Sequence, residues 1–355
     1  MADSRREPTP AEAGFSMPPE WRRHESTWLA WPKDPVTWPE RVPQVEEVFL
    51  QMIALLTAQE RVDLLVDDPE TEQDVSQRLT NLLGALPALR FHQVVTVDSW
   101  IRDYGPNFLL SHDNSTLAFN HWLFNAWGGK YEELKKDASI PDKLAPALKA
   151  RRFTPGIVLE GGSIDVNGGG VCLTTEQCLL NPNRNPRLSK AEIEQTLGDY
   201  LGVKRVLWLG EGIVGDDTDG HVDDIARFVR ADTIICALER DPADANHKPL
   251  LDNYERLRKA RDANGHPFRI ITLPMPRPIE GLEGRLPASY ATFYMANGVV
   301  LAPVFGDPND SRAIEILSEV FLDRTVAGVR CENLVWGLGA IHCITQQQPA
   351  TRLTR

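Results

Sequence analysis

The sequence lacks the features that would place this protein in a membrane or outside the cell. No apolar run approaches the roughly 18 residues of a membrane-spanning helix, and residues 1–20 contain no apolar segment typical of a secretory signal. The five cysteines include no CxxC pair, and their odd number argues against a disulfide framework. We therefore expect a cytoplasmic protein whose thiols are reduced.

Positive charge is also in deficit. The chain has 38 Lys and Arg residues against 50 Asp and Glu residues, which gives a formal net charge of −12. This balance disfavours nucleic acid and anionic membranes as partners, because both attract basic surfaces. It favours a small cationic substrate drawn into an acidic cleft, although acidity for solubility alone would give the same balance. The phosphate-binding pattern GxxxxGK[ST] is absent as well.

No linker rich in proline, glycine and serine divides the 355 residues. We therefore expect one catalytic domain over residues 1–355, with residues 1–16 as a flexible N-terminal extension. Apolar runs occur in pairs around polar turns, two of which carry Asn-Gly, a strong hairpin signal. The predicted hairpins pair residues 107–110 with 116–119, 163–166 with 170–174, 225–229 with 233–238, and 290–294 with 299–303.

Helices and further strands are predicted between the hairpins. Apolar residues at three- and four-residue spacing predict helices at 45–59, 142–151, 189–201, 250–263 and 309–321. Strands are expected at 61–66, 91–97, 205–209 and 269–273. Residues 28–32 and 341–347 would complete a fifth unit across the two termini. A unit that recurs about every 50–70 residues favours a closed radial α/β array over a doubly wound sheet.

Polar clusters stand at matching points of this repeat. Asp103, Glu160 and Asp223 each lie seven to ten residues before the centre of the next turn. Equivalent positions in radially arranged units converge on one axis, so we expect these carboxylates to meet, with His221 beside them. Each residue also has a simpler reading. Asp103 could pair with Arg102, Glu160 could cap a turn, and His221 could be a hydrogen-bonded core residue.

Cys343 follows a glycine pair near the end of the chain, where it could present a thiolate to a site. The thiol alone proves little, because free cysteine is among the most buried residue types. Together with three carboxylates and a histidine, it suits attack on a guanidinium carbon. Carboxylates bind the N–H groups of that cation, the thiolate attacks its carbon, and histidine protonates the leaving amine. His342 would point away from Cys343 if both lay in a strand, so His221 is the predicted base.

A metal site is the main alternative. Asp219, His221 and Asp223 match the D-x-H-x-D ligand pattern of binuclear manganese ureohydrolases, which release urea rather than ammonia. No second aspartate-rich motif accompanies them, so half the ligands of a two-metal site are missing. The segment also fails the calcium-loop pattern, because Gly215 would occupy its first position. We therefore expect neither a metal nor another cofactor. A catalytically silent propeller used for binding is a third reading.

At these residues the chain resembles the agmatine deiminase family, the bacterial branch of the guanidino-group-modifying enzymes that also include peptidylarginine deiminases. The resemblance implies a five-bladed α/β propeller of pseudo-fivefold symmetry (the pentein fold), no metal, and hydrolysis of a guanidine to a ureido product and ammonia. It spans nearly the whole sequence and rests on the motifs MPPEW (17–21), TWLAWP (27–32), WIRDYGP (100–106), FNAWGGKY (124–131), EGGS (160–163), LLNPNRNP (179–186), GDDTDGHVD (215–223) and IHCITQQ (341–347).

The resemblance also implies roles for individual residues. Cys343 resembles the nucleophile of the family, and His221 resembles its general acid and base. Glu160 resembles the carboxylate that orients this histidine. Asp103 and Asp223 resemble the carboxylates that bind the guanidinium group.

Trp100 resembles a wall of the substrate pocket, whereas two other positions depart from the family pattern. Ala340 stands where asparagine is usual, and Asp165 stands where histidine is common. Neither is among the five proposed catalytic residues, but both bear on which substrate is bound. The expected partner is a small cationic guanidino compound, and a homo-oligomer is compatible with the sequence. The expected reaction converts agmatine to N-carbamoylputrescine in polyamine biosynthesis, and arginine in peptides or another guanidine is the alternative substrate.

Overall fold

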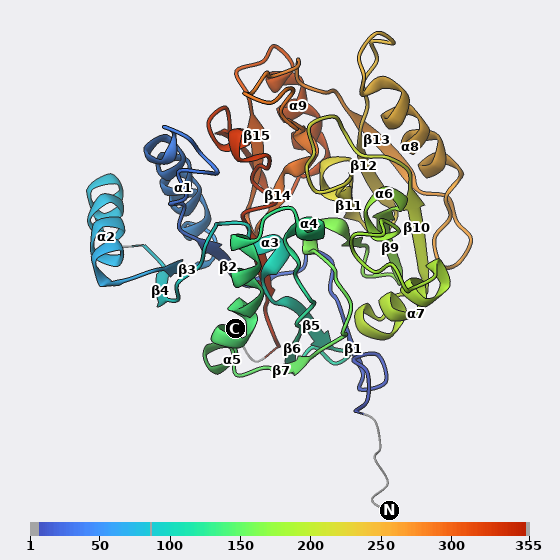
Figure 1. Ribbon diagram of the computed structural model, residues 1–355, viewed down its shortest axis with the longest axis horizontal. Coiled ribbons are helices and arrows are strands. Elements are labelled where there is room, and N and C mark those ends of the chain that lie inside the picture. The colour runs from blue at the N-terminus through green and yellow to red at the C-terminus, as the bar shows by residue number, and fades with distance from the viewer. Residues whose placement is uncertain (1–6, 86, 353–355) are drawn as a thin grey trace, which may run out of the picture.

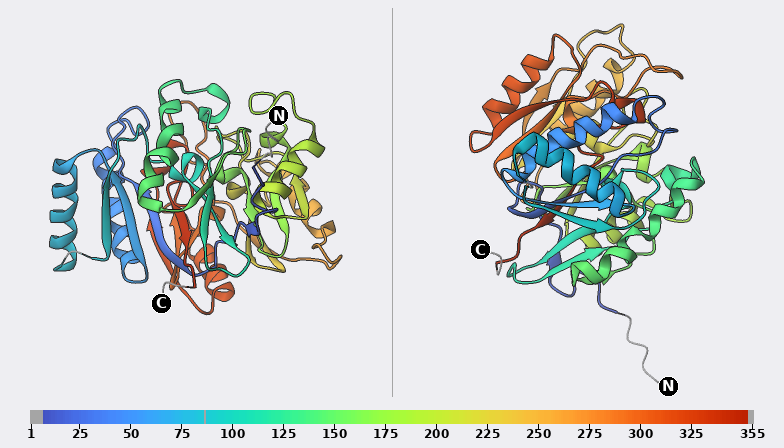
Figure 2. Two further views of the ribbon diagram at one scale, coloured as in Figure 1. Left: turned by 90° about the horizontal axis from the view of Figure 1, so that it is seen from below. Right: turned by 90° about the vertical axis from the view of Figure 1, so that its left-hand side faces the viewer.

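The computed structural model describes residues 7–85 and 87–352. Within these residues the strands form five separate sheets, none of which closes on itself. The longer helices lie at the periphery, outside the sheets (Figures 1 and 2). The molecule therefore has the mixed α/β fold that the sequence predicts.

All five sheets share one pattern, in which an antiparallel pair of strands continues into a parallel strand. Three sheets consist of this pattern alone: β8 (Asp165–Val166), β9 (Val171–Thr175) and β10 (Arg205–Leu209); β11 (Ala226–Arg230), β12 (Thr233–Ala237) and β13 (Arg269–Leu273); β14 (Tyr294–Met295), β15 (Val299–Val304) and β16 (Thr325–Arg330). Two sheets carry a fourth strand: β1 (Phe15–Ser16), β5 (Asn107–Ser111), β6 (Leu117–Asn120) and β7 (Arg151–Phe153); β17 (Gln346–Pro349), β2 (His24–Ala30), β3 (Arg61–Val66) and β4 (Leu89–Gln93). The four predicted hairpins are thus confirmed as antiparallel pairs.

The predicted helices are confirmed, with shifted ends. The helices of eight or more residues are α1 (Val42–Thr57), α2 (Pro69–Leu83), α5 (Ile140–Leu148), α7 (Lys190–Leu201), α8 (His247–Lys259) and α9 (Asp310–Val320). Helix α5 ends before the predicted residue 151, because Lys149 adopts a left-handed conformation and residues 151–153 form β7. Helix α2 was not predicted. Only Val75 and Leu79 on it are buried, which leaves a weak apolar stripe in the sequence.

Short helical turns precede the first strand of each antiparallel pair. They are α3 (Ile101–Tyr104) before β5, η2 (Gly161–Ser163) before β8, η3 (Val222–Asp224) before β11, and η4 (Tyr290–Thr292) before β14. A turn at residues 341–344 stands in the same place before β17. The strands expected at 163–166, 290–294 and 341–347 therefore begin later than predicted.

These turns are joined to one another by hydrogen bonds. The Ser289 hydroxyl donates to the Asp224 carbonyl at 2.8 Å, which joins the start of η4 to η3. The His342 N–H donates to the Thr292 carbonyl at 3.0 Å, and the Arg102 N–H donates to the Cys343 carbonyl at 3.2 Å. The Gly162 N–H of η2 donates to Asp103 Oδ1 of α3 at 2.9 Å, which joins these two turns. Residues that are far apart in the sequence thus meet at one place.

The two ends of the chain are built into the sheets. Strand β17 pairs with β2, which confirms the fifth unit predicted across the termini. At the end of the segment expected to be a flexible extension, residues 15 and 16 form β1, which pairs with β5, and the side chain of Phe15 is buried. Residues 1–6 of that extension lie outside the described residues.

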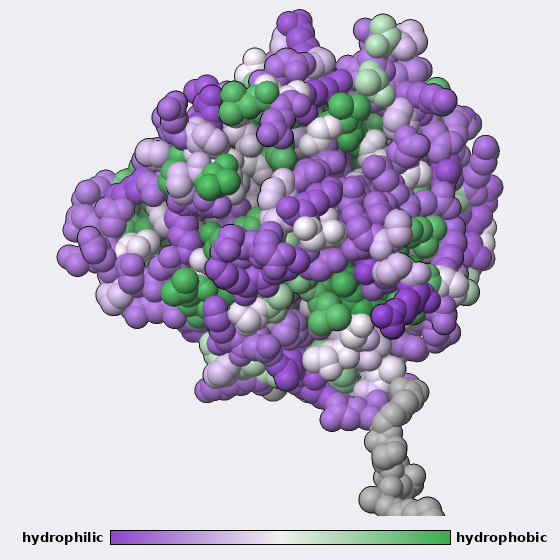
Figure 3. Space-filling model, viewed as in Figure 1, coloured by the Kyte–Doolittle hydropathy of each residue, from purple (hydrophilic) through white to green (hydrophobic). Residues whose placement is uncertain are grey.

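Apolar side chains gather inside the molecule. The largest cluster joins strands β2, β3 and β15 to helices α1 and α9. The face seen in Figure 3 is mainly hydrophilic, and its hydrophobic patches are small and separate. In the described part of the chain, no helix combines the length and apolar character needed to cross a bilayer.

Helix α7 provides a test of the local structure. The Ser189 side chain accepts a hydrogen bond from the Glu192 N–H, and the Glu192 carboxylate accepts one from the Ser189 N–H, which forms a capping box. We expect Ser189→Ala to lower the free energy of unfolding by about 1 kcal/mol, without a change in catalytic activity. Denaturant unfolding monitored by circular dichroism measures this, and an unchanged midpoint would contradict the assigned cap.

Candidate active site

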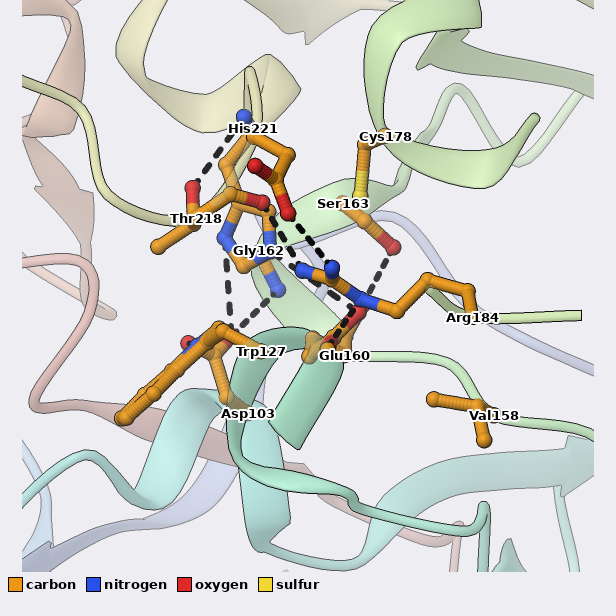
Figure 4. A network of polar contacts seen from close by, with 12 residues as sticks. Asp103, Trp127, Val158, Glu160, Gly162, Ser163, Cys178, Arg184, Thr218 and His221 are labelled. Atoms are coloured by element: carbon orange, nitrogen blue, oxygen red, sulfur yellow. Dashed lines mark hydrogen bonds and ion pairs between the residues drawn. The ribbon is translucent and has the colours of Figure 1, made fainter. Parts of the chain in front are cut away.

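The predicted polar residues converge around Gly162 (Figure 4). A Cβ atom at this glycine would lie 2.6 Å from His221 Nδ1, 2.9 Å from Asp223 Oδ2 and 3.0 Å from Asp103 Oδ1. The Gly162 N–H also donates to Asp103 Oδ1 at 2.9 Å. Asp103 of α3, His221 directly before η3 and Asp223 within η3 therefore surround Gly162 of η2. Only glycine leaves room for them.

Cys343 lies beside this group, in the turn at residues 341–344. Its side chain is buried, and its sulfur lies within 4.8 Å of carboxylate oxygens of Asp223 and Asp224. The Trp100 ring packs against the backbone next to it, since a Cβ at Gly339 would lie 2.6 Å from the ring and 3.2 Å from the Cys343 Cβ. Trp100 is held in turn by Asp98, which accepts a hydrogen bond from its indole N–H at 2.8 Å.

His221 lies between two carboxylates. Its Nδ1 is 3.8 Å from Asp103 Oδ1, on the side that faces Gly162, and its Nε2 is 3.9 Å from Glu160 Oε2. Burial lowers the pKa of His221, but Asp103, Cys178 and Glu160 together raise it well above its usual value. The imidazole is therefore held as a cation.

Arg184 balances the charge of Glu160. Its Nε donates to Glu160 Oε1 at 2.7 Å, and both side chains are fully buried. Burial raises the pKa of Glu160, whereas His221 and Arg184 lower it further, so that the pKa lies below its ordinary value. Arg184 lies in the motif LLNPNRNP, but no role was predicted for it from the sequence.

The thiol of Cys343 is held in its protonated form. Burial raises its pKa well above the ordinary value, and the negative charges of Asp223, Asp224 and Asp103 raise it further. A thiol in such surroundings loses its proton only at alkaline pH or when a cation enters the site.

The connecting segment of residues 125–131, which includes α4 (Ala126–Gly129), contacts the site. Ala126 and Trp127 both adopt left-handed conformations, with φ of 56° and 52°, which residues other than glycine seldom do. This backbone directs the Trp127 indole to Asp103, whose Oδ2 accepts its N–H at 2.9 Å. Lys130 bonds to Asp219 at 3.0 Å, and the Tyr131 hydroxyl bonds to Asp217. Trp127 lies in the motif FNAWGGKY, but its contact with Asp103 was not predicted from the sequence.

The simpler readings of the site residues do not hold. Arg102 points away from Asp103 and donates to Gln347 Oε1 at 2.8 Å. Glu160 precedes η2, but its side chain makes no capping bond. Nε2 of the buried His221 has no hydrogen-bond partner among the described residues, so it is not a satisfied core histidine.

The metal reading is weakened by the position of Asp219. Its Oδ2 is 2.6 Å from Arg184 and its Oδ1 is 3.0 Å from Lys130, so both oxygens of this carboxylate already face cations. Among the described residues, the metal-compatible groupings are Glu160 with Cys178 and His221, and Asp223 with Asp224 and Cys343. Neither grouping includes Asp219, and the D-x-H-x-D residues do not form a common set of ligands.

Comparison with known proteins identifies the family. The family model described as Porphyromonas-type peptidyl-arginine deiminase matches residues 16–349. An agmatine deiminase of Medicago truncatula is 37% identical over 377 residues, which cover 97% of this chain and 99% of that protein. The structure of an agmatine deiminase of Enterococcus faecalis aligns with a TM-score of 0.89 at 33% identity, covering 98% of this chain and 100% of that chain. The structure of a cysteine-to-serine variant of C. jejuni agmatine deiminase with substrate bound aligns with a TM-score of 0.84 at 30% identity, over 95% of this chain and 97% of that chain.

These matches span nearly the whole chain and place it among the deiminases. The chain belongs to the agmatine deiminase family, which the Porphyromonas-type model describes. The resemblance inferred from the sequence motifs is thereby confirmed.

Gly162 gives a direct test of the site. We expect Gly162→Ala to fold but to lose activity by at least about 100-fold, because the new methyl group displaces His221, Asp103 and Asp223 from their positions. Gly198→Ala in α7 is the matched control and should keep wild-type kcat/KM. A folded Gly162→Ala protein with wild-type kcat/KM would show that these residues do not act together.

Proposed function

We propose that this protein hydrolyses agmatine to N-carbamoylputrescine and ammonia, with Cys343 as the nucleophile. The observation that carries the proposal is the unpaired Asp223 Oδ1, which is buried without a hydrogen-bond partner among the described residues. A buried carboxylate oxygen without a donor is costly. The N–H groups of a guanidinium cation would satisfy it and would bring the guanidinium carbon toward the thiol. The agmatine deiminases among the relatives support agmatine as the substrate.

In the proposed mechanism each residue has a separate task. Asp103 and Asp223 accept N–H groups of the guanidinium, whose positive charge lowers the raised pKa of the Cys343 thiol, so that the thiol proton passes to solvent. The resulting thiolate attacks the guanidinium carbon to form a C–S bond, and the C=N electron pair moves onto nitrogen. The His221 imidazolium gives its proton to the leaving nitrogen, so that the C–N bond breaks and ammonia departs. Neutral His221 then takes a proton from water, whose oxygen attacks the same carbon. The C–S bond breaks, which yields the ureido product and restores the thiolate.

Glu160 acts through His221 in this scheme. The distance of 3.9 Å from Glu160 Oε2 to His221 Nε2 is longer than a hydrogen bond. Such contacts are often long without substrate and tighten when it binds. Arg184 fixes the other oxygen of Glu160, so that Glu160 keeps Oε2 toward the histidine.

The closed site favours a small substrate over arginine in a protein. Cys343 is only 9% exposed, and Trp127 binds Asp103, while Tyr131 of the same connecting segment binds Asp217. A peptide-linked arginine would require this connector to open around the peptide chain. Peptidylarginine and other guanidines are the competing substrates. Comparing the product released from agmatine, arginine and an arginine-containing peptide distinguishes them.

We also propose that the five sheets form a five-bladed propeller within a single catalytic domain over residues 1–355. The shared strand pattern and the linked turns before each antiparallel pair support this arrangement. The absence of disulfides among the five cysteines, all of which are described, supports a reducing compartment such as the cytoplasm.

Cys343→Ser tests the nucleophile. We expect activity to fall by at least about 1,000-fold, because a serine hydroxyl is a weak nucleophile without a dedicated base. Agmatine, arginine and an arginine-containing peptide are each offered with and without a chelator, and ammonia, urea and ureido product are measured. Wild-type protein should release ammonia from agmatine with chelator present. Cys236→Ser is the matched control, since that buried thiol lies in β12 and should tolerate the change.

Two outcomes contradict this proposal. Full activity in Cys343→Ser would exclude the thiol mechanism. Urea release that a chelator abolishes would favour the metal-dependent alternative.

The pH dependence of thiol alkylation tests the state of Cys343. Because its pKa is raised, we expect inactivation of the free enzyme by iodoacetamide to keep accelerating as pH rises above about 9, past the usual thiol pKa. A cationic haloacetamidine should react faster near neutral pH, because its charge stabilises the thiolate. An alkylation rate that reaches its plateau below about pH 7 would show a resting thiolate instead.

A further inference from the structure

A chain of buried ionisable side chains runs from the N-terminal segment to the proposed guanidinium site. Glu20 lies between β1 and β2, and its Oε2 accepts hydrogen bonds from Arg227 at 2.7 Å and from His342 Nε2 at 2.8 Å. Its Oε1 accepts the Met295 N–H at 2.9 Å. On the other side of the ring, His342 Nδ1 is 2.6 Å from Asp223 Oδ2. The ring therefore bridges Glu20 and a proposed substrate-binding carboxylate.

The hydrogen-bond pattern determines the protonation of His342. Burial raises the pKa of Glu20, but Arg227 and His342 lower it until it lies well below the ordinary value. Burial likewise raises the pKa of Asp223, and His342 is the largest of the influences that bring it below the ordinary value. An ionised carboxylate can only accept hydrogen bonds, so both ring nitrogens of His342 must donate. The ring is consequently an imidazolium cation.

This arrangement also fixes the orientation of Asp223. His342 occupies Oδ2, while Oδ1 stays unpaired and buried. The His342 backbone is held by the Thr292 carbonyl at 3.0 Å, so the ring is anchored at its base as well as at both nitrogens. One oxygen of Asp223 is thus bound to the protein and the other is left for substrate.

We propose that Glu20 and His342 form a positioning pair that keeps Asp223 ionised and turned toward the substrate guanidinium. The proposal rests on the proposed role of Asp223 in the reaction. It gives a function to the MPPEW motif and to the histidine beside the nucleophile. Neither residue needs to touch the substrate.

Other ionisable groups lie near Asp223 and Glu20 and affect their pKa values. Those that act on Asp223 are His342, His221, Arg227, Asp103, Asp224 and Cys343. Those that act on Glu20 are Arg227, His342, Arg102, Asp165, His24 and Tyr294. Burial raises the pKa of Asp165 to about 6, against the opposing effect of Arg227. Protonation of Asp165 leaves Arg227 on Glu20, so it does not break the pair.

Glu20→Gln and His342→Gln test the pair through the pH profile of kcat/KM. The pKa of Asp223 is lowered in the wild type, so the activity that depends on its ionised form is lost only when pH falls through that low pKa. Without the hydrogen bond and charge of His342 this pKa rises. We therefore expect the acid limb to move to higher pH in both variants, with kcat/KM reduced about 10- to 100-fold at neutral pH, mainly through KM. The kcat/KM of the double variant should be no lower than that of the less active single variant, because the two residues act as one unit.

Asp63→Asn is the matched control. Asp63 in β3 lies 2.7 Å from Nε2 of His92, so this change also removes a buried carboxylate from a histidine, but away from both Glu20 and Asp223. We expect it to lower the thermal midpoint without moving the acid limb. An acid limb that stays in place in folded Glu20→Gln and His342→Gln, or that moves equally in Asp63→Asn, would overturn the proposal.

Nitrogen-15 NMR of labelled histidines tests the pair without reference to activity. Both ring nitrogens of wild-type His342, assigned by the loss of their signals in His342→Gln, should carry a proton, because each lies against a carboxylate oxygen that accepts a hydrogen bond. In Glu20→Gln we expect Nε2 to lose its proton, because an amide can donate to it. A neutral His342 ring in the wild type would overturn the proposal. Full activity in Asp223→Asn with an imidazolium His342 would instead locate the failure in the proposed role of Asp223.

Discussion

The rest of this structure depends on the balance of charges that are buried away from water. Asp103, Glu160 and Asp223 are 6%, 0% and 1% exposed. A carboxylate in such surroundings is costly unless donors or cations surround it. These partners are an indole, an arginine and a histidine, which come from three different connecting segments. One oxygen of Asp223 has no hydrogen-bond donor among the described residues. In the proposed function, a cationic substrate supplies that donor.

The sheets serve to bring these partners together. Each antiparallel pair is preceded by a short turn, and the turns carry the carboxylates, the imidazole and the thiol. Cys343 reaches the others because β17 pairs with β2, and the Arg102 N–H binds its carbonyl. The N-terminal segment that leads into β2 also supplies Glu20. The position of Cys343, the proposed nucleophile, and the charge of its neighbours therefore depend on the same pairing of β17 with β2.

Many strands and the convergence of the carboxylates could be predicted from the sequence, because the repeat shows itself in local apolar runs and turn residues. Strands 61–66, 205–209 and 269–273 match β3, β10 and β13 to the residue, and the matching positions of three carboxylates indicated that they would meet. The partners of those carboxylates could not be predicted. Arg184 and Glu20 lie in irregular segments without periodicity, and their contacts span long stretches of chain. His342 was set aside because a strand was expected there, whereas the chain forms a turn that directs its ring to Asp223.

The two departures from the family pattern fit this balance of charge. Burial and the neighbouring carboxylates raise the pKa of Cys343, and the backbone N–H of Ala340 partly offsets this rise. Asp165 lies one step behind the substrate site, with its Oδ2 2.5 Å from Arg227 Nε. Arg227 is thereby shared between Asp165 and Glu20. Residue 165 is therefore joined to Asp223 through the ion pairs of Arg227, Glu20 and His342, without being one of the proposed substrate-binding residues.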